Sequence, residues 1–414
     1  MTKVKYFFPD SQDFIDPEFN FLSEENGEHR IVQRDDLYCH ECFSKPPYDG
    51  MLVSKGIVDG VIGNGARYTG SMRQRFYRQK VKKFLRLPTH MEVMGDCGAF
   101  TYVHEEVPPY TVEEVINYYQ RYGFDLGISL DHIIFEFETL EKASTKTEIL
   151  GDRLKEAERR LELNRALAKE FLKKAKTCSF TPIGVVHGWN PEIYAGEAKY
   201  IQSLGYEYLA LGGMVPLRTN EIFEVLEHVY PVLKAGVKLH LLGISRVGEA
   251  EKFAELGVAS VDSTSPLMHS FKDRTRNYYT PDRSDYTAIR IPQTDNNNIV
   301  RKKIRMGAID HDASKRLEKA CLDSVRQCAS RNLAVDAAVE TLMEYHCVIH
   351  DKDEPKLRSA YERVLEDKPW KYCSCDLCRD AGVEILIFRG SERNKRRGFH
   401  NVFVTHKILM GNYS

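Results

Sequence analysis

Hydrophobic residues between positions 90 and 265 occur in short β-branched runs that alternate with longer amphipathic stretches. Six such repeats of strand then helix predict a parallel sheet with helical crossovers. A flavodoxin-like open sheet would also fit, but six units in series with polar residues at most strand ends favour a (β/α)8 barrel. The expected strands read HMEVMG, GISLDHII, TPIGVVHG, YEYLALGG, VKLHLLGI and VASVDS.

The helices between these strands have recognisable starts. Thr111 and Glu114 predict a capping box before VINYYQRYG. Asn190 and Pro191 supply a cap and a first-turn proline for the next helix. The stretch TNEIFEVLEHVYPVLKAG presents one apolar face, and we expect its helix to end at Gly236.

Some segments fall outside this repeat. The missing barrel strands are expected in residues 50–75 and in the C-terminal segment. Residues 139–177 predict a long charged helix on the solvated side of the barrel. Residues 279–350 begin as a loop and continue as two helices, near 311–331 and 334–347, typical of a helical insertion.

Charge and composition narrow the possible partners. The 414 residues carry a formal net charge of −1, so a nucleic-acid partner would need a local basic surface. Hydrophobic residues make up 42%, which allows a sizeable core. We find neither an apolar run of about 18 residues nor a basic-then-apolar leader, and therefore expect a cytoplasmic protein. The ten cysteines do not suggest a disulfide scaffold, and clustered ones indicate a metal.

In a (β/α)8 barrel, functional side chains collect at the carboxyl ends of the strands. Glycines there let a flat ligand approach the backbone, and facing carboxylates suit attack on a cationic carbon together with proton transfer. Asp before Gly or Ser is also ordinary turn chemistry, and a lone His is often structural. Neither a GxGxxG nor a P-loop motif occurs. The residues at these ends are Asp96, Asp131, His187, Gly188, Gly212, Gly213, Gly243 and Asp262.

A metal motif lies near the C-terminus, where Cys373, Cys375 and Cys378 are followed by His400. Three thiolates and one imidazole complete a tetrahedral zinc site with no position left for water, which predicts a structural ion. The free energy of zinc binding would then contribute directly to the stability of the fold. Accidental clustering is the alternative. The second C-x-x-C, formed by Cys39 and Cys42, has no evident partner pair, and we interpret it as structural or incidental.

The predicted fold class is therefore α/β, a TIM-like (β/α)8 barrel with a C-terminal structural zinc subdomain and a helical insertion. The expected parts are an N-terminal extension at 1–60, a catalytic barrel core at 61–278, the loop and helical insertion at 279–350, and a zinc-binding subdomain completing the barrel at 351–414.

The zinc motif after a barrel, together with GDCGAF, LGG and VDS, resembles the tRNA-guanine transglycosylases. Other stretches are more similar to their DNA-acting relatives, the DpdA-type 7-deazaguanine DNA transglycosylases: FFPDSQDFIDPEFNF, PPYDGMLVSKG, FLRLP, MGDCGAFTYV and GFDLGISLDHII. The resemblance covers nearly the whole chain. It implies a pentosyltransferase that exchanges guanine in DNA for a 7-deazaguanine such as preQ0, through a covalent Asp-glycosyl intermediate.

By position, the resemblance implies that Asp262 is the nucleophile and Asp96 the general acid/base. General chemistry agrees, because a carboxylate can trap an oxocarbenium-like carbon and guanine leaves more readily when protonated. The target nucleotide must also leave the base stack. The implied base-binding residues are Asp131, His187, Gly188, Gly212, Gly213, Cys97 and Phe100. Departures from the tRNA enzymes at Cys97, Ala99, His132 and His187 leave the incoming base open, and segment 279–350 favours a polynucleotide other than tRNA.

Basic side chains available for a nucleic-acid backbone occur in three segments. Residues 73–88 form one candidate segment. A second is the cluster inside the zinc loop, which includes Arg389 and Lys395, and its alternative interpretation is a solvated charged loop. The predicted backbone contacts are Lys272, Arg274, Arg276, Arg393, Arg396 and Arg397. Expected partners are DNA, a free 7-deazaguanine base and, from the resemblance, an ATPase; a homodimer stays open.

Three other functions compete with this interpretation. The same chemistry on tRNA, of the queuosine or archaeosine type, is the nearest. A non-catalytic, zinc-stabilised barrel that only binds nucleic acid is disfavoured by the presence of both Asp96 and Asp262. A cysteine hydrolase using Cys97 with His104 is disfavoured because the adjacent Asp96 would raise the thiol pKa.

Overall fold

The computed structural model describes residues 3–60, 66–137 and 150–411. The chain divides into two compact units. Of the described residues, 3–12, 48–60, 66–137, 150–264 and 408–411 form the barrel unit, and 13–47 and 265–407 form the C-terminal unit.

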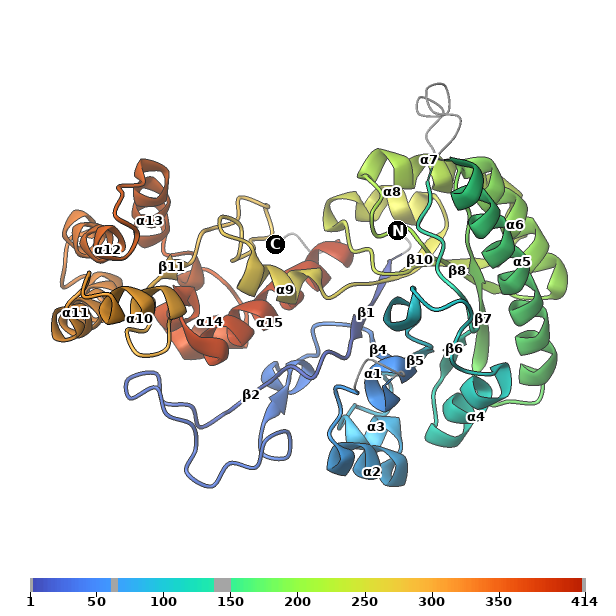
Figure 1. The fold of residues 1–414 in the computed structure, drawn as a ribbon, viewed down its shortest axis with the longest axis horizontal. Helices are drawn as coiled ribbons and strands as arrows, with labels where there is room; N and C mark the ends of the chain where they lie inside the picture. Colours follow the sequence, from blue (N-terminus) through green and yellow to red (C-terminus); the bar gives the residue numbers. More distant parts are fainter. Residues whose placement is uncertain (1–2, 61–65, 138–149, 412–414) are drawn as a thin grey trace. The chain divides into compact units, whose positions relative to one another are not determined.

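Eight parallel strands of the barrel unit close on themselves (Figure 1). β1 pairs in parallel with both β10 and β4, which closes the sheet and excludes the open-sheet alternative. All six strands expected from the hydrophobic pattern are present. In barrel order the strands are β1 (Lys5–Pro9), β4 (Gly50–Ser54), β5 (Glu92–Asp96), β6 (Leu126–Ile128), β7 (Thr181–Val186), β8 (Tyr208–Leu211), β9 (Lys238–Leu241) and β10 (Val258–Asp262).

The start of the barrel differs from the expected boundary at residue 61. β4 lies in the expected 50–75 segment, but the eighth strand is β1, inside the supposed N-terminal extension, and the C-terminal segment supplies no barrel strand. The sequence signal for β1 was weak, because KYFFP is only five residues long and segment 13–47 of the C-terminal unit separates it from β4.

Helices follow most barrel strands, as the repeat predicted. Thr111 forms the expected capping box with Glu114, and the Asn190 side chain accepts a hydrogen bond from the Ile193 N–H. The expected helix ending at Gly236 instead ends at Val229, where Pro231 forces a 3-10 turn. The helices of this unit are α1 (Lys55–Asp59), α2 (Gly70–Gln79), α3 (Val81–Phe84), α4 (Val112–Tyr122), α5 (Leu150–Ala175), α6 (Pro191–Leu204), α7 (Thr219–Val229) and α8 (Ala250–Glu255). Residues 139–149 of the expected long helix lie outside the described residues.

The core of the barrel unit is a buried cluster drawn from six strands. Phe7, Leu52 and Met94 pack there with aliphatic residues of β6 to β8, and each is almost inaccessible to solvent. Burial of such side chains contributes roughly 1.5–3 kcal/mol each, so this layer fixes the relative positions of the strand ends.

The C-terminal unit is mostly helical and also contains two small sheets, β2 (Phe14–Ile15) with β3 (Leu37–Tyr38) and β11 (Ile289–Arg290) with β12 (Ile387–Phe388). The two helices expected in the insertion are present as α11 and α12. Its helices are α9 (Ser265–Lys272), α10 (Asn298–Arg305), α11 (His311–Ala329), α12 (Val335–His350), α13 (Pro355–Asp367), α14 (Asp376–Ala381) and α15 (Gly390–Leu409).

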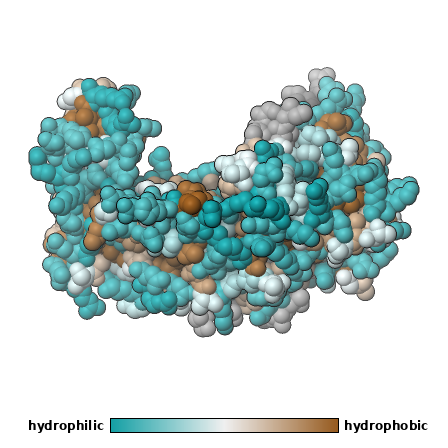
Figure 2. All heavy atoms as spheres, turned by 90° about the horizontal axis from the view of Figure 1, so that it is seen from below, coloured by the Kyte–Doolittle hydropathy of each residue, from teal (hydrophilic) through white to brown (hydrophobic). Residues whose placement is uncertain are grey.

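In the part of the chain that the structure describes, every helix is too short or too polar to span a bilayer. The face drawn in Figure 2 is mostly hydrophilic, and its hydrophobic side chains form small separate patches.

Candidate active site and metal centre

Three carboxylates end or follow strands of the barrel unit. Asp96 is the last residue of β5, Asp262 is the last residue of β10, and Asp131 follows β6. Asp131 and Asp262 are only 4% and 6% exposed. Since the carboxyl ends of parallel strands meet at one rim, these acids share the same end of the barrel.

Asp262 is held through one of its two oxygens. Its Oδ1 accepts a hydrogen bond from the Gly243 N–H at 2.8 Å and lies 3.1 Å from His240 Nε2. No described residue contributes a hydrogen bond to Oδ2. The carboxylate is therefore oriented by two donors on one side, and its other oxygen is available to a substrate.

Behind His240 lies a buried hydrogen-bonded chain. His240 Nδ1 is 2.6 Å from Ser260 Oγ, and Ser260 Oγ is 2.5 Å from the Tyr208 hydroxyl. His240 and Ser260 are both fully buried, and they are register partners on β9 and β10. If the Asp262 carboxylate accepts from Nε2–H, then neutral His240 accepts from Ser260 and Ser260 accepts from Tyr208. The chain thus fixes the ring orientation of His240.

Asp96 has a different environment. Its Oδ2 accepts the Gly98 N–H at 2.9 Å. Burial, together with the nearby charges of Asp131 and Asp262, raises the pKa of Asp96 to about 7. Gly98 has a φ of +85°, and a Cβ there would lie 2.4 Å from Ser54 Oγ, so the turn beside Asp96 requires glycine. Asp96 can therefore hold or release a proton near neutral pH.

Asp131 has donors on both oxygens. His187 Nε2 lies 2.8 Å from Oδ2, and the Cys97 thiol donates to Oδ1 at 3.1 Å. Burial and the charge of Asp131 raise the pKa of Cys97 well above its ordinary value. Cys97 is thus a thiol donor, which argues against the cysteine-hydrolase reading. Tyr102 fixes Cys97, donating to its Sγ at 3.0 Å.

The glycines at the ends of β7 and β8 have packing reasons of their own. A Cβ at position 212 would lie 2.4 Å from the His187 ring, and one at position 213 would lie 2.3 Å from the Ile134 carbonyl oxygen. A Cβ at position 188 would lie 2.8 Å from the Tyr194 backbone nitrogen. Close approach of a ligand is therefore not needed to explain Gly188, Gly212 or Gly213.

His132, noted as a departure from the tRNA enzymes, forms hydrogen bonds to other segments of the barrel unit. Its backbone N–H donates to Asn164 Oδ1 at 2.7 Å, and its Nε2 is 2.8 Å from the Glu105 carbonyl oxygen. Phe100, in contrast, is 55% exposed and lies beside Phe135, with ring centroids 5.6 Å apart. Phe100 is therefore an accessible flat surface close in sequence to Asp96.

The predicted metal ligands come together in the C-terminal unit. The ligand atoms of Cys373, Cys375, Cys378 and His400 all lie within 4.8 Å of one another. His400 directs Nδ1 at the three sulfurs, 3.4 to 3.5 Å away, while its Nε2 is 2.9 Å from the Tyr279 carbonyl oxygen. That outer hydrogen bond sets the ring orientation, as is usual for metal-binding histidines. The cluster could hold one metal ion.

The second C-x-x-C does not join a comparable cluster among the described residues. Cys39 is buried, and the Cys42 thiol donates to the Tyr38 carbonyl oxygen at 3.3 Å.

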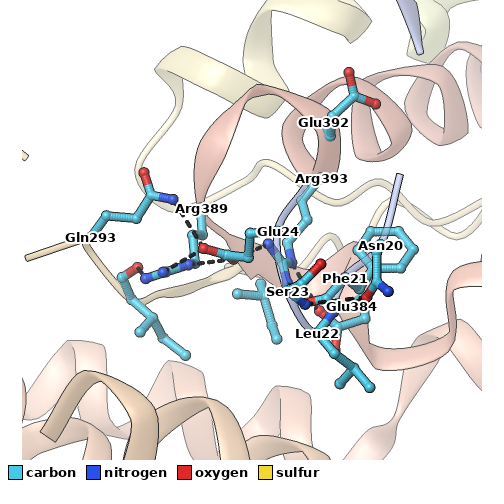
Figure 3. A network of polar contacts seen from close by, with 12 residues as sticks. Asn20, Phe21, Leu22, Ser23, Glu24, Gln293, Glu384, Arg389, Glu392 and Arg393 are labelled. Atoms are coloured by element: carbon cyan, nitrogen blue, oxygen red, sulfur yellow. Dashed lines mark hydrogen bonds and ion pairs between the residues drawn. The ribbon is translucent and has the colours of Figure 1, made fainter. Parts of the chain in front are cut away.

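Most arginines in the zinc loop form ion pairs inside the C-terminal unit, which argues against the prediction that they contact nucleic acid. Figure 3 shows Arg389 and Arg393 around Glu24. Arg393 also lies 2.8 Å from Glu384, and Arg396 pairs with Glu392 at 2.6 Å. Arg393 is 1% exposed.

Arg397 is also fully buried, but its bonds go to neutral acceptors. It donates to the carbonyl oxygens of Ile385 and Ser270 and to Asn394 Oδ1. Lys395 of the same helix donates to the Phe14 carbonyl oxygen at 2.9 Å. Lys272, Arg274 and Arg276 remain exposed, although Arg276 pairs with Asp285 at 2.8 Å, so their role as backbone contacts stays a prediction.

Sequence reasoning missed His240, Ser260 and Tyr208. The signal available was one polar or hydroxyl-bearing residue within each of three mostly apolar strands, with Ser260 two positions before Asp262 and hence on the same face of β10. Periodicity alone did not reveal that His240 faces the same point from β9.

The chain is similar over its full length to a DNA-guanine transglycosylase of Salmonella montevideo. The two are 47% identical over 410 residues, which is 99% of this chain and 97% of that protein. It is also 28% identical over 191 residues to a tRNA-guanine(15) transglycosylase of Pyrobaculum aerophilum, covering 44% of this chain and 35% of that protein. No protein-family model matches the chain.

Proposed function

Because the chain belongs to the DNA-guanine transglycosylase family, we propose that it exchanges guanine in DNA for a 7-deazaguanine base such as preQ0. The observation that carries this proposal is the division of labour among the acids of one barrel rim. Asp262 is oriented through Oδ1, whereas Asp96 has a pKa of about 7. A carboxylate nucleophile and a separate proton carrier are what a double displacement at C1′ requires.

In the first displacement, Asp262 Oδ2 attacks C1′ of a nucleotide that has left the base stack. The C1′–N9 bond breaks, and its electron pair goes to guanine, which takes a proton from Asp96. The products are a glycosyl ester on Asp262 and free guanine. Asp96 is then a carboxylate that can accept the N9 proton of the incoming base.

In the second displacement, N9 of the incoming base attacks C1′ and the bond to Asp262 breaks. The proton lost from N9 goes to Asp96, which returns both acids to their starting states. Formation of the ester also removes the charge of Asp262, one of the causes of the raised pKa of Asp96. The first displacement therefore lowers the pKa of Asp96 during the step in which Asp96 gives its proton to guanine.

His240 acts as a positioning residue in this scheme. Its Nε2–H and the Gly243 N–H both bind Oδ1, which aims Oδ2 at C1′. The same two donors stabilise the carboxylate that the second displacement releases.

Asp131 is proposed to read the guanine edge, since a carboxylate accepts from the N1–H and the exocyclic amine. His187 and Cys97 each take only one of its acceptor positions and hold it in place. Phe100 is proposed to stack on a base.

We propose that the Cys373, Cys375, Cys378 and His400 cluster holds Zn²⁺. Three thiolates and an imidazole leave no open coordination position, so the ion would supply folding energy and no catalytic step.

The test is base exchange by the purified protein with radiolabelled preQ0, offered plasmid DNA and bulk tRNA in separate reactions. We expect label in DNA, none in tRNA, and none in either with Asp262→Asn. Label in tRNA alone would replace this proposal with the tRNA reaction, which the partial similarity to the Pyrobaculum enzyme makes the second candidate.

A further inference from the structure

A cavity of about 700 Å³ lies within the C-terminal unit, and its wall includes Arg274, one of the predicted backbone contacts. Its walls come from β11, α12, α13 and the loops that precede α10 and α15. This volume is in the range of sites that hold a nucleotide-sized ligand.

Two arginines of this cavity, Arg274 and Arg290, lack a carboxylate partner. In the described part of the chain, neither has a carboxylate oxygen within 4.0 Å. Arg290 is partly buried, lies with its guanidinium 4.0 Å from the centre of the Phe388 ring, and donates to the Asp273 carbonyl oxygen at 3.3 Å. Burial and the charge of Arg274 lower the pKa of Arg290, while the charge of nearby Asp273 partly opposes them. The charge of exposed Arg274 thus adds to the cost of keeping partly buried Arg290 charged.

A third guanidinium adds to this unbalanced charge. Arg397 lies 5.1 Å from the Phe388 ring and is fully buried among neutral acceptors. Burial and the charge of Arg290 lower the pKa of Arg397 to about 9. An anion bound beside Arg290 would offset the repulsion in this group.

The other charged side chains of the wall are already balanced or neutral. Arg389 pairs with Glu24 and Glu318, and Glu354 pairs with Lys352. Burial lowers the pKa of His346, and of His350 beside it, so both are neutral near pH 7. The charge left over is positive.

The residues around the cavity are also positively charged. Lys356 of its wall has no ion pair with any described residue, and α10, which begins at the cavity, carries exposed Arg301, Lys302 and Arg305. Asn296 and Gln293 add side-chain amides to the wall, which already donate to Gln293 Oε1 and to Glu24 respectively.

We propose that this cavity binds a phosphate group of the DNA strand, gripped by Arg274 and Arg290. Guanidinium forks match phosphate oxygens, and a chain with a net charge of −1 needs a local cationic site for a polyanion. The zinc-loop arginines that carry internal ion pairs cannot supply it. The inference rests on the proposed function for the choice of DNA over a free phosphate.

The test compares Arg274→Gln and Arg290→Gln with wild-type protein, using fluorescence anisotropy of a labelled DNA duplex over a range of salt concentrations. Arg316→Gln, an exposed arginine of α11 outside the cavity, is the matched control. We expect each cavity variant to bind roughly three- to tenfold more weakly near 0.1 M salt and to lower the salt slope by about one, with the control unchanged.

Because Arg290 is partly buried, thermal unfolding first checks that Arg290→Gln is folded. Arg274 is exposed, so Arg274→Gln tests DNA binding independently. Wild-type DNA affinity and salt slope in Arg274→Gln would overturn the inference. A second result would also overturn it: millimolar inorganic phosphate stabilises the wild type but not Arg274→Gln, while DNA binding is the same in both. That result would assign the site to a free anion. Failure of the proposed function looks different: the wild type would then not exchange bases in DNA, whatever the variants bind.

Discussion

The pH dependence of guanine release tests the assignment of Asp96 most directly. The first displacement requires a protonated Asp96, whose pKa is about 7 because burial and the charges of Asp131 and Asp262 oppose ionisation. The protonated fraction is then about 0.9 at pH 6 and about 0.1 at pH 8. Release of guanine should therefore slow by roughly tenfold over this range.

The assay is a single turnover on DNA carrying radiolabelled guanine, without an incoming base. Rapid quenching follows free guanine, and a denaturing gel follows the covalent protein–DNA adduct. Asp96→Asn should release guanine about 10²- to 10⁴-fold more slowly and without this pH dependence. Asp262→Asn should form no adduct. A wild-type rate that is flat or rises from pH 6 to pH 8 would refute the assignment of Asp96 as the acid.

Four further outcomes are expected. Asp96→Asn should raise the melting temperature at pH 8. Folding raises the pKa of the Asp96 carboxyl to about 7, so the wild-type protein loses stability as the pH rises from the pKa of this carboxyl in the unfolded chain to about 7. Equal melting temperatures of the wild type and the variant at pH 8 would contradict this. His240→Phe should lower kcat by about 10²-fold with little change in the KM for DNA, and His240→Gln, which keeps a donor, should recover part of the loss; an effect on KM alone would remove the positioning role. Cys375→Ser should reduce bound zinc, measured by elemental analysis, and lower the melting temperature, whereas full zinc content would exclude Cys375 as a ligand. Arg393→Met should lower the free energy of unfolding in denaturant titrations, because it removes one of the two arginines that pair with Glu24 and one of the two that pair with Glu384, and it should keep the salt slope of DNA binding; a lower slope in a stable variant would restore Arg393 as a phosphate contact.

The barrel could be predicted because its buried parallel strands read as nearly continuous apolar runs. β1 escaped because a five-residue run carries little periodic signal and a segment of the other unit follows it. The shared position of the rim acids followed from the barrel alone, since polar residues at the carboxyl ends of parallel strands must lie at the same rim.

The contacts that give these residues their roles could not be predicted in the same way. His240 meets Asp262 only because β9 and β10 pair in a register that sets His240 beside Ser260. Arg389 and Arg393 looked like part of a basic surface because Glu24, the partner they share, is 365 and 369 positions away in sequence. Charge runs reveal the sign of side chains but not whether distant segments neutralise them.

The three rim acids are chemically alike, so their surroundings must separate their roles. Asp262 receives a backbone N–H and an imidazole on the same oxygen, which leaves one oxygen for attack. Asp131 has a donor on each oxygen, which suits a fixed acceptor. Asp96 accepts one backbone N–H and faces the charges of both other acids, and its pKa of about 7 makes it the proton carrier. Removing one of those charges, as in Asp131→Asn, should therefore lower the pKa of Asp96 and shift the pH profile of guanine release to lower pH. A profile that weakens in amplitude but does not move would mean that burial alone sets the protonation of Asp96.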